Sequence, residues 1–584
     1  MKPVRLPASA TSALPRLGMW ALGLLYILPG LIGRDPWKND DASSFGIMWT
    51  MAHGSLNTWL APQIVGLPMP GESPLTFWVG AICIKMFGWL LGDPLAARLS
   101  TIIFFLIGSL SVWYATYLLG RRNEAQPLRL AFGGQPESKD FGRTMADGAF
   151  LIYLSCLGLL LHSHETTAKS LQMSLVAYAV YLTVRLFDAS STAPSTTRTA
   201  AFTLRSAALL GMALGLLTLA RGWGVPLTIF IGLITLALLR AKNITIHLLL
   251  VTLPIAIIVS SAWFLVSYLL LPNGNNFAFW QEHNLRQFGW PTLTGFAYYF
   301  KYGIWFAWPV WPFAGWAVYA WRQQRKALHI TLPLTFFISL TIMILLMPCP
   351  NEGILLPLLP ALVIMAAFGL PTMKRGAINA VDWFSVMTLT TCAAFIWIGW
   401  IAKETGWPTQ IAMNAYKMAP GFKPGFNMTA LTIAILGSIC WIVLVNWRLS
   451  RRPAVLWRAV VLSSGGVVLC WLLLMTLWLP WINYSKSYAG VALQIDAHLP
   501  TVKQCVDTNV GPAQRASFAY FGEIPFSKFS QKSCDFLLYQ DNNNTKSDDA
   551  VIWRQFNGHW KLLWSGRRPS DRDERFRLYQ RVGN

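Results

Sequence analysis

The stretch "TIHLLLVTLPIAIIVSSAWFLVSYLLL", residues 245–271, contains no Asp, Glu, Lys or Arg. A helix of about 20 apolar residues matches the hydrocarbon thickness of a lipid bilayer. A second long apolar run covers residues 457–481, and similar runs recur along the whole chain. The sequence therefore predicts helices that cross a membrane repeatedly.

The composition of the whole chain agrees with this interpretation. Of the 584 residues, 54% are hydrophobic and only 12% are charged. Soluble globular proteins carry about 25% charged residues. We expect an all-α polytopic membrane protein.

The net charge of +22 lies mostly in short loops beside the apolar runs. Cytoplasmic loops of membrane proteins are enriched in Lys and Arg, so we assign these loops to the cytoplasm and not to nucleic-acid binding. The basic residues in question are Arg121, Arg122, Arg240, Lys242, Arg322, Arg325, Lys326, Lys374, Arg375, Arg448, Arg451 and Arg452.

About thirteen transmembrane helices, with the N-terminus inside, place all of these loops on one side. The predicted spans are 15–33, 95–119, 145–163, 168–187, 203–220, 224–240, 245–271, 298–320, 329–347, 353–372, 381–402, 428–447 and 457–481. The first span can insert without cleavage, so no signal peptide is required.

One further apolar segment, "SPLTFWVGAICIKMFGWLLG" (73–92), is excluded from the spans. If it crossed the membrane, every later loop would change sides. It also carries Lys85 in its middle. We expect an interfacial helix that lies on the outer surface.

The polar C-terminal region, 482–584, follows the last span and is expected outside as a small α/β domain, separate from the transmembrane domain 1–481. Six of the eight cysteines fall in or beside spans. The other two, Cys505 and Cys534, could form a disulfide in an oxidising compartment.

Two outer loops, 34–94 and 272–297, contain most of the candidate chemistry. Their notable residues, with two others at the same level, are Asp35, Asp40, Asp41, His53, Glu72, Glu282, His283, Arg286, Arg221 and the pair His164/Glu165. Each has an ordinary alternative role. The acids at 40 and 41, or Asn39, can cap a helix that ends at Gly54. Glu72 can be a solvated charge, and the arginines can anchor lipid headgroups.

Taken together, these residue types at one water–membrane boundary suit an acid/base residue, ligands for a divalent ion and cations for a phosphate. They indicate chemistry in which a lipid-borne phosphate is the leaving group. The sequence has no Walker motif and no Gly-rich dinucleotide loop, which argues against a nucleotide-driven pump.

Five motifs resemble those of one family. They are "NDDASSFGIMWTMAHGSLNTWLAP", "GESPLTFWVGAICIKMFG", "FWQEHNLRQF", "TLARGWGVPL" and "LLPLLPALVIMAA". In this order they are similar to motifs of the GT-C glycosyltransferases that use polyprenyl-phosphate sugars, above all the lipid A aminoarabinose transferases and more distantly the protein O-mannosyltransferases.

The resemblance implies roles for individual residues. Asp40 matches the candidate catalytic aspartate, and Asp41 its acidic neighbour. Glu72 and His283 match positions that hold a divalent ion, which could be Zn, Mg or Mn. Arg286 and Arg221 match basic positions near the donor phosphate.

Lys85 is expected either to assist at the phosphate or to extend toward the interface. Two departures from the family pattern are notable. Ser73 replaces a lysine that reaches the phosphate, and Gln172 stands where an aspartate is usual.

The resemblance implies an inverting glycosyltransferase that moves a hexosyl or pentosyl group from a polyprenyl-phosphate (undecaprenyl-type) donor to lipid A, a protein or a glycan. It also implies an inner-membrane location, with the active site and C-terminal domain in the periplasm. Two alternatives remain open: a transporter or flippase for a lipid-linked sugar, and a ligase or polymerase of lipid-linked glycans.

Overall fold

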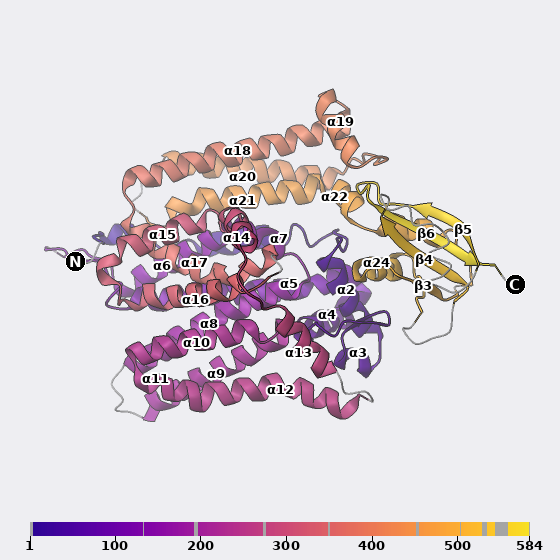
Figure 1. Ribbon diagram of the computed structural model, residues 1–584. Coiled ribbons are helices and arrows are strands. Elements are labelled where there is room, and N and C mark those ends of the chain that lie inside the picture. The colour runs from indigo at the N-terminus through magenta and orange to yellow at the C-terminus, as the bar shows by residue number, and fades with distance from the viewer. Residues whose placement is uncertain are drawn as a thin grey trace.

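The computed structural model describes residues 4–131, 133–191, 197–271, 276–348, 351–450, 455–502, 504–527, 534–542 and 559–582. It contains a large helical bundle and a small domain with a β-sheet, which lies at one end of the bundle (Figure 1). The N-terminus lies at the opposite end of the bundle from this domain (Figure 1).

In the described part of the chain, nine helical segments are long and apolar enough to cross a membrane. They are α5 (Asp93–Arg121), α8 (Ala168–Ser191), α9 (Thr197–Arg221), α11–η2–α12 (Lys242–His247, Leu248–Thr252 and Leu253–Leu270), α16 (Leu328–Leu345), η4–α17–η5 (Glu352–Leu358, Leu359–Gly369 and Leu370–Thr372), α18 (Arg375–Thr405), α20 (Met428–Ser450) and α21 (Arg458–Leu477). The chain is thus a multi-pass membrane protein.

Burial of these helices follows their composition. Helix α17 is apolar on all sides and entirely buried, as expected for the centre of a bundle, whereas α12 and α20 expose most of their apolar surface. Exposed apolar surface of this extent on peripheral helices is the surface that a membrane covers.

Four predicted spans correspond to shorter, broken or less apolar helices. These are α1 (Arg16–Ile27), α6 and α7 (Ser138–Ser155 and Leu157–His162), α10 (Gly224–Arg240), and α14 and α15 (Leu293–Phe306 and Val310–Ala320). The predicted span 298–320 consists of two helices, α14 and α15. The helix is divided before Pro309, which has no N–H to donate to a helical hydrogen bond.

The basic loops lie together, as the positive-inside prediction requires. Arg122 forms ion pairs with Glu124 and Asp188, and Arg240 donates to the carbonyl of Lys326. The N-terminus joins this group through η1 (Ala8–Thr11), where Ala8 N donates to Gly134 O at 2.8 Å. We call this the basic end of the bundle; η3 (Arg322–Gln324) belongs to it. Arg451 and Arg452 lie outside the described residues.

The opposite end, which we call the domain end, contains the short elements of the outer loops. They are α2 (Asp40–His53), α3 (Leu56–Leu60), β1 (Gln63–Ile64), β2 (Leu67–Pro68), α4 (Leu75–Leu91), α13 (Asn276–Arg286), α19 (Thr409–Met418) and α22 (Leu479–Lys486). Of the predicted loop 272–297, residues 272–275 lie outside the described residues.

Helix α4 is the segment that we excluded from the spans. It packs against α2 and α5 through Phe77, Ala81 and Ile84, and exposes Met86 and Trp89 on its other face. It lies at the domain end (Figure 1). Its place at the membrane interface stays a prediction.

The C-terminal domain has the expected α/β composition. Its elements are α23 (Ala489–Asp496), β3 (Val506–Thr508), α24 (Pro512–Phe521), β4 (Phe536–Asn542), β5 (Trp560–Gly566) and β6 (Glu574–Arg581). The strand order is β3-β4-β6-β5, with β3 parallel to β4 and the other pairs antiparallel. Phe518, Phe576 and Leu578 form part of its core.

This domain docks on the bundle through α24, which packs directly on α2. The two helices approach so closely that a Cβ atom at Gly46 would lie 2.4 Å from the Cβ of Ala516. Arg515 fixes the contact by donating to Val65 O at 2.7 Å. Helix α2 is therefore held between α4 and the C-terminal domain.

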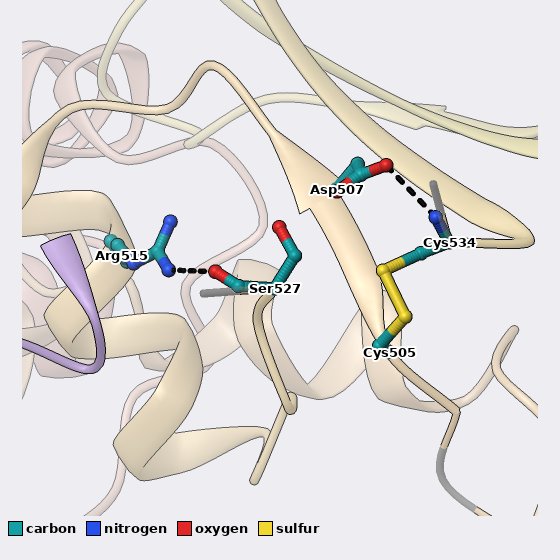
Figure 2. Close-up of a disulfide and its surroundings, with 5 residues drawn as sticks. All are labelled: Cys505, Asp507, Arg515, Ser527 and Cys534. Atoms are coloured by element: carbon teal, nitrogen blue, oxygen red, sulfur yellow. Dashed lines mark hydrogen bonds between the residues drawn. A yellow bond between two sulfur atoms is a disulfide. The ribbon is translucent and has the colours of Figure 1, made fainter. Parts of the chain in front are cut away.

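Cys505 and Cys534 are joined by a disulfide that links the start of β3 to the segment before β4 (Figure 2). Beside it, the backbone N–H of Cys534 donates to Asp507 Oδ2 at 3.0 Å, and Arg515 donates to Ser527 O at 2.7 Å. The disulfide places two parallel-strand neighbours in register.

We expect Cys505 and Cys534 in the purified full-length protein to resist alkylation until a reductant is added. Mass spectrometry of tryptic peptides before and after reduction measures this. Cys392 and Cys440, which are exposed free thiols, serve as internal controls because they are alkylated in denaturant without reduction. Alkylation of Cys505 and Cys534 without reductant would contradict the disulfide and the oxidising location that it requires.

Candidate active site

Helix α2 begins with two aspartates that have different surroundings. Asp41 is buried, whereas the side chain of Asp40 is 57% exposed. The helix ends at His53 before Gly54, as predicted, but Asn39 makes no side-chain capping hydrogen bond. The capping interpretation therefore does not explain these acids.

The carboxylate of Asp41 is the centre of a buried network. Oδ2 accepts from Trp37 N at 3.1 Å and from Arg98 Nη2 at 3.1 Å, while Arg34 Nη2 lies at 3.5 Å. Oδ1 accepts from the backbone N–H and the hydroxyl of Thr166, at 2.9 and 3.0 Å. One side chain thereby joins the 34–41 segment, α5 and the turn before α8.

Burial acts against ionisation of Asp41, but the two arginines and the backbone donors outweigh it and lower the pKa of the carboxyl. Every part of this carboxylate is occupied by protein donors. The sequence suggested that Asp41 shares the catalytic role of Asp40. The geometry instead makes it a positioning residue, because a fully bonded, buried carboxylate has no lone pair left for a substrate.

Asp40, in contrast, faces a cavity of about 400 Å³ at the domain end. Its Oδ2 accepts from Lys169 Nζ at 2.6 Å, and the same ammonium lies 3.4 Å from Asn351 Oδ1. The remaining charged residues of the lining are Lys38, Lys486, His162, Glu165 and Glu352. A carboxylate that is held by one cation and still open to a polar cavity can accept a proton from a bound nucleophile.

Lys169 is the functional candidate that the sequence interpretation missed. It lies in the first turn of α8, and its stem packs against Gly353, where a Cβ atom would come within 2.4 Å of Lys169 Cδ. The available signal was a lysine in an otherwise apolar span, since ionisable residues in membrane helices are rare and usually functional.

Glu72, Arg221 and His283 are linked by electrostatic interactions that extend to Asp40. The charge of Arg221, at the end of α9, interacts with both Glu72 and Asp40. The ring of His283 lies on Gly71, where a Cβ atom would be 2.6 Å from His283 Cγ. Burial raises the pKa of Glu72, although Arg221 partly opposes this, and burial followed by Arg221 lowers the pKa of His283.

The two departures from the family pattern have roles in this arrangement. Gln172 Oε1 accepts from Arg221 Nη1 at 3.4 Å. Ser73 is buried and links three segments, because its hydroxyl donates to Thr218 O at 3.3 Å and accepts from Trp280 Nε1 at 3.0 Å. Ser73 and Gln172 are both neutral, so they cannot supply the charges of the lysine and the aspartate that the family pattern has at these positions.

The sequence predicts that Glu72 and His283 hold a divalent metal ion. Within the described ranges, no group of three or more His, Cys, Asp or Glu residues could hold a metal ion. Protein sites for catalytic zinc usually supply three ligands. The divalent ion therefore stays a prediction, and the charge of Arg221 acts on Glu72.

Two other predicted phosphate-binding residues lie apart from this group. Arg286 is 77% exposed and pairs with Glu282 at 2.6 Å on the surface of α13. Lys85 is exposed on α4, with Nζ 5.3 Å from the ring centre of Trp59. The structure brings neither cation to Asp40.

An apolar cavity of about 280 Å³ lies between α14, α16 and η4–α17. Its lining includes Phe296, Phe300, Phe337 and Leu362. Tyr299 also lines it, and this residue interacts electrostatically with Arg221. The apolar cavity therefore begins close to the polar group of Asp40, Glu72 and Arg221.

Comparison with solved structures identifies the fold. ArnT from Cupriavidus metallidurans bound to undecaprenyl phosphate has a TM-score of 0.66 at 14% sequence identity, with 96% of this chain and 97% of ArnT covered. Its apo state gives a TM-score of 0.62 at 15% identity, with the same coverage. This chain therefore has the GT-C fold of ArnT over almost its whole length.

A weaker structural match is the archaeal oligosaccharyltransferase AglB from Archaeoglobus fulgidus, with a TM-score of 0.40 at 13% identity, covering 86% of this chain and 63% of AglB. We draw no argument from it. No protein-family model matches the sequence, and no curated protein sequence does either.

We expect Asp41→Asn to destabilise the protein by roughly 3–5 kcal/mol, because the substitution leaves two buried arginines without a counter-charge. Thermal unfolding of the purified protein in detergent measures the loss. Asp535→Asn, at an exposed position of the C-terminal domain, is the matched control and should change stability by less than about 0.5 kcal/mol. Equal stability of the two variants would contradict the network.

We expect Glu72→Gln to be at least as stable as the unmodified protein at pH 7. The raised pKa of Glu72 means that folding favours its protonated form, so its contribution to stability is complete below about pH 4 and is lost as the pH rises through the folded-state pKa. A neutral glutamine avoids this loss. Unfolding midpoints between pH 4 and pH 8 test the prediction; a variant that is less stable at pH 7 but not at pH 4 would refute it.

Proposed function

We propose that this protein is an inverting glycosyltransferase that takes a sugar from a polyprenyl-phosphate donor and transfers it to an acceptor at the outer face of a membrane. The observation that carries the proposal is Asp40. Its carboxylate is held by Lys169 in a polar cavity and lies within electrostatic range of Arg221, which also interacts with Tyr299 of the apolar cavity. The ArnT fold supports the same class of donor, because that structure contains undecaprenyl phosphate.

The phosphate and the polyprenyl chain of the donor suit two different environments, the polar group around Arg221 and the apolar cavity. Arg221 is the cation best placed to bind the phosphate, since a guanidinium can donate two parallel hydrogen bonds to phosphate oxygens. Tyr299 stands where the polar group and the apolar cavity meet. The first isoprene units can be buried there, with about 0.8 kcal/mol gained for each methylene removed from water.

Transfer requires one displacement. Asp40 accepts the proton of the acceptor nucleophile as the nucleophile bonds to the anomeric carbon. The bond between that carbon and the phosphate oxygen breaks on the opposite side, and its electron pair stays with the phosphate. Polyprenyl phosphate leaves, its new negative charge next to Arg221. A single displacement inverts the anomeric configuration.

The other side chains of the group orient these partners. Lys169 fixes the Asp40 carboxylate, and Gln172 supports the guanidinium of Arg221. Glu72 lies within electrostatic range of Arg221, whose charge partly opposes the effect of burial on the Glu72 carboxyl. We assign no step to a divalent ion.

We further propose that the domain end faces the periplasm and that the protein lies in a bacterial inner membrane. The basic loops gathered at the other end support this orientation. The disulfide at the domain end supports it as well. The acceptor can be lipid A, a protein or a glycan.

We expect Asp40→Asn to lower the transfer rate of the purified enzyme by about a hundred-fold or more, because an amide cannot accept the proton of the nucleophile. Transfer from a labelled polyprenyl-phosphate sugar to envelope lipid and protein extracts measures the rate. Asp535→Asn, which removes an exposed carboxylate far along the chain, should leave the rate unchanged.

The same assay separates the alternatives. A transferase releases free polyprenyl phosphate and adds one sugar residue per donor, whereas a ligase or polymerase adds a whole glycan. A transporter moves the donor across proteoliposomes and leaves it intact. Full transfer activity in Asp40→Asn, or intact donor after turnover by the unmodified protein, would overturn the proposal.

A further inference from the structure

Another cavity, of about 590 Å³, lies among the first turns of α1 and α6 and the last turns of α5. The N-terminal segment, which precedes α1, is at the opposite end of the molecule from the C-terminal domain (Figure 1). This cavity therefore belongs to the basic end and is separate from the site around Asp40.

Three cations line the cavity, each near the start of its helix: Arg16 on α1, and Lys139 and Arg143 on α6. Across the described stretches of the chain, no carboxylate lies within ion-pair distance of any of the three. Positive charge is thus available for an anionic ligand.

Two carboxylates also line the cavity, Asp140 and Asp147. Asp147 is buried and bonded to the protein, since it accepts from Leu14 N at 2.9 Å and from Trp113 Nε1 at 3.0 Å. Asp140 is exposed. Arg121 adds a fourth positive charge next to the cavity wall, because its Cζ lies 5.4 Å from the ring centre of Tyr117. Positive charge therefore prevails.

Aromatic rings of α5 form one wall of the cavity. Tyr117 is stacked on Trp113, with ring centres 5.4 Å apart and an interplanar angle of 15°. Tyr114 meets Trp113 edge to face, at 4.9 Å. Trp and Tyr are enriched where a membrane protein passes from hydrocarbon to headgroups.

Along α1 and α5, the cavity lining changes from charged and aromatic residues at the basic end to apolar residues toward the middle of the bundle. On α5, the cavity wall runs from Leu110 to Tyr117, about 10 Å along the helix axis. On α1, Arg16 is followed by Met19 and Trp20, and Trp20 is half exposed. The charged rim and the apolar floor fit a ligand with one charged and one apolar part, and not a small soluble anion.

We propose that this cavity binds one anionic phospholipid. Arg16, Lys139 and Arg143 contact the headgroup phosphate, and the acyl chains lie along Met19, Trp20 and Leu110. The lipid connects α1 to α5 and α6. Helix α1 is 12 residues long and exposes Leu17, Trp20 and Leu24, an apolar surface that acyl chains can cover. This inference does not depend on the reaction at Asp40.

The test uses the full-length protein, purified and delipidated in a neutral detergent, with phosphatidylglycerol as the probe and native mass spectrometry as the readout. The variant is Arg16→Gln with Lys139→Gln, because both side chains are exposed and their loss should not disturb folding. The control is Arg322→Gln with Arg325→Gln, which removes the same charge from exposed positions at the same end.

We expect the affinity for phosphatidylglycerol to fall about five-fold for each neutralised cation in the variant, and to be unchanged in the control. Phosphatidylglycerol should also raise the unfolding temperature of the unmodified protein more than that of the variant. Equal loss in variant and control, or equal binding of phosphatidylcholine, would overturn the proposal. Competition by inorganic phosphate alone at matched concentration would also overturn it, since the site would then be one for a soluble anion.

Discussion

The structure of the domain end depends on the hydrogen bonds and ion pairs of the Asp41 carboxylate. This carboxylate receives hydrogen bonds from the segment before α2, from Arg98 on α5 and from Thr166 before α8. Two buried arginines would be untenable in a membrane protein without this counter-charge. Because three segments distant in sequence meet at one side chain, the first turn of α2 has a fixed position above the bundle.

Because this turn is fixed, the side chains of the adjacent residues Asp40 and Asp41 point in different directions. Successive residues on a helix point about 100° apart, so when Asp41 is directed into the protein, Asp40 must face elsewhere. It faces the polar cavity, where Lys169 holds it. The C-terminal domain supports the arrangement from above through the close contact between Gly46 and Ala516. The domain is thus part of the scaffold that positions the proposed base.

Much of the architecture was predictable from residue types. Apolar runs longer than about 18 residues have few alternatives to a membrane span, and the basic loops fixed which ends lie together. The surroundings of individual side chains were predicted less accurately than the architecture. Residue type alone does not separate Asp40 from Asp41, and only the family resemblance singled out Asp40. Arg286 proved to be exposed, and Lys169 was overlooked because it lies in an apolar segment remote from both outer loops.

The sequence by itself determined a multi-pass helical protein with an α/β domain after the last span, and the positions of α2 and its acids, because these follow from local composition and periodicity. Only the tertiary structure decided which acid faces the polar cavity and which cation pairs with it. It also decided that Glu72 faces Arg221 and that a lipid-sized cavity lies at the basic end. Such facts depend on contacts between residues far apart in the chain, and a one-dimensional pattern does not encode the directions of side chains across those contacts.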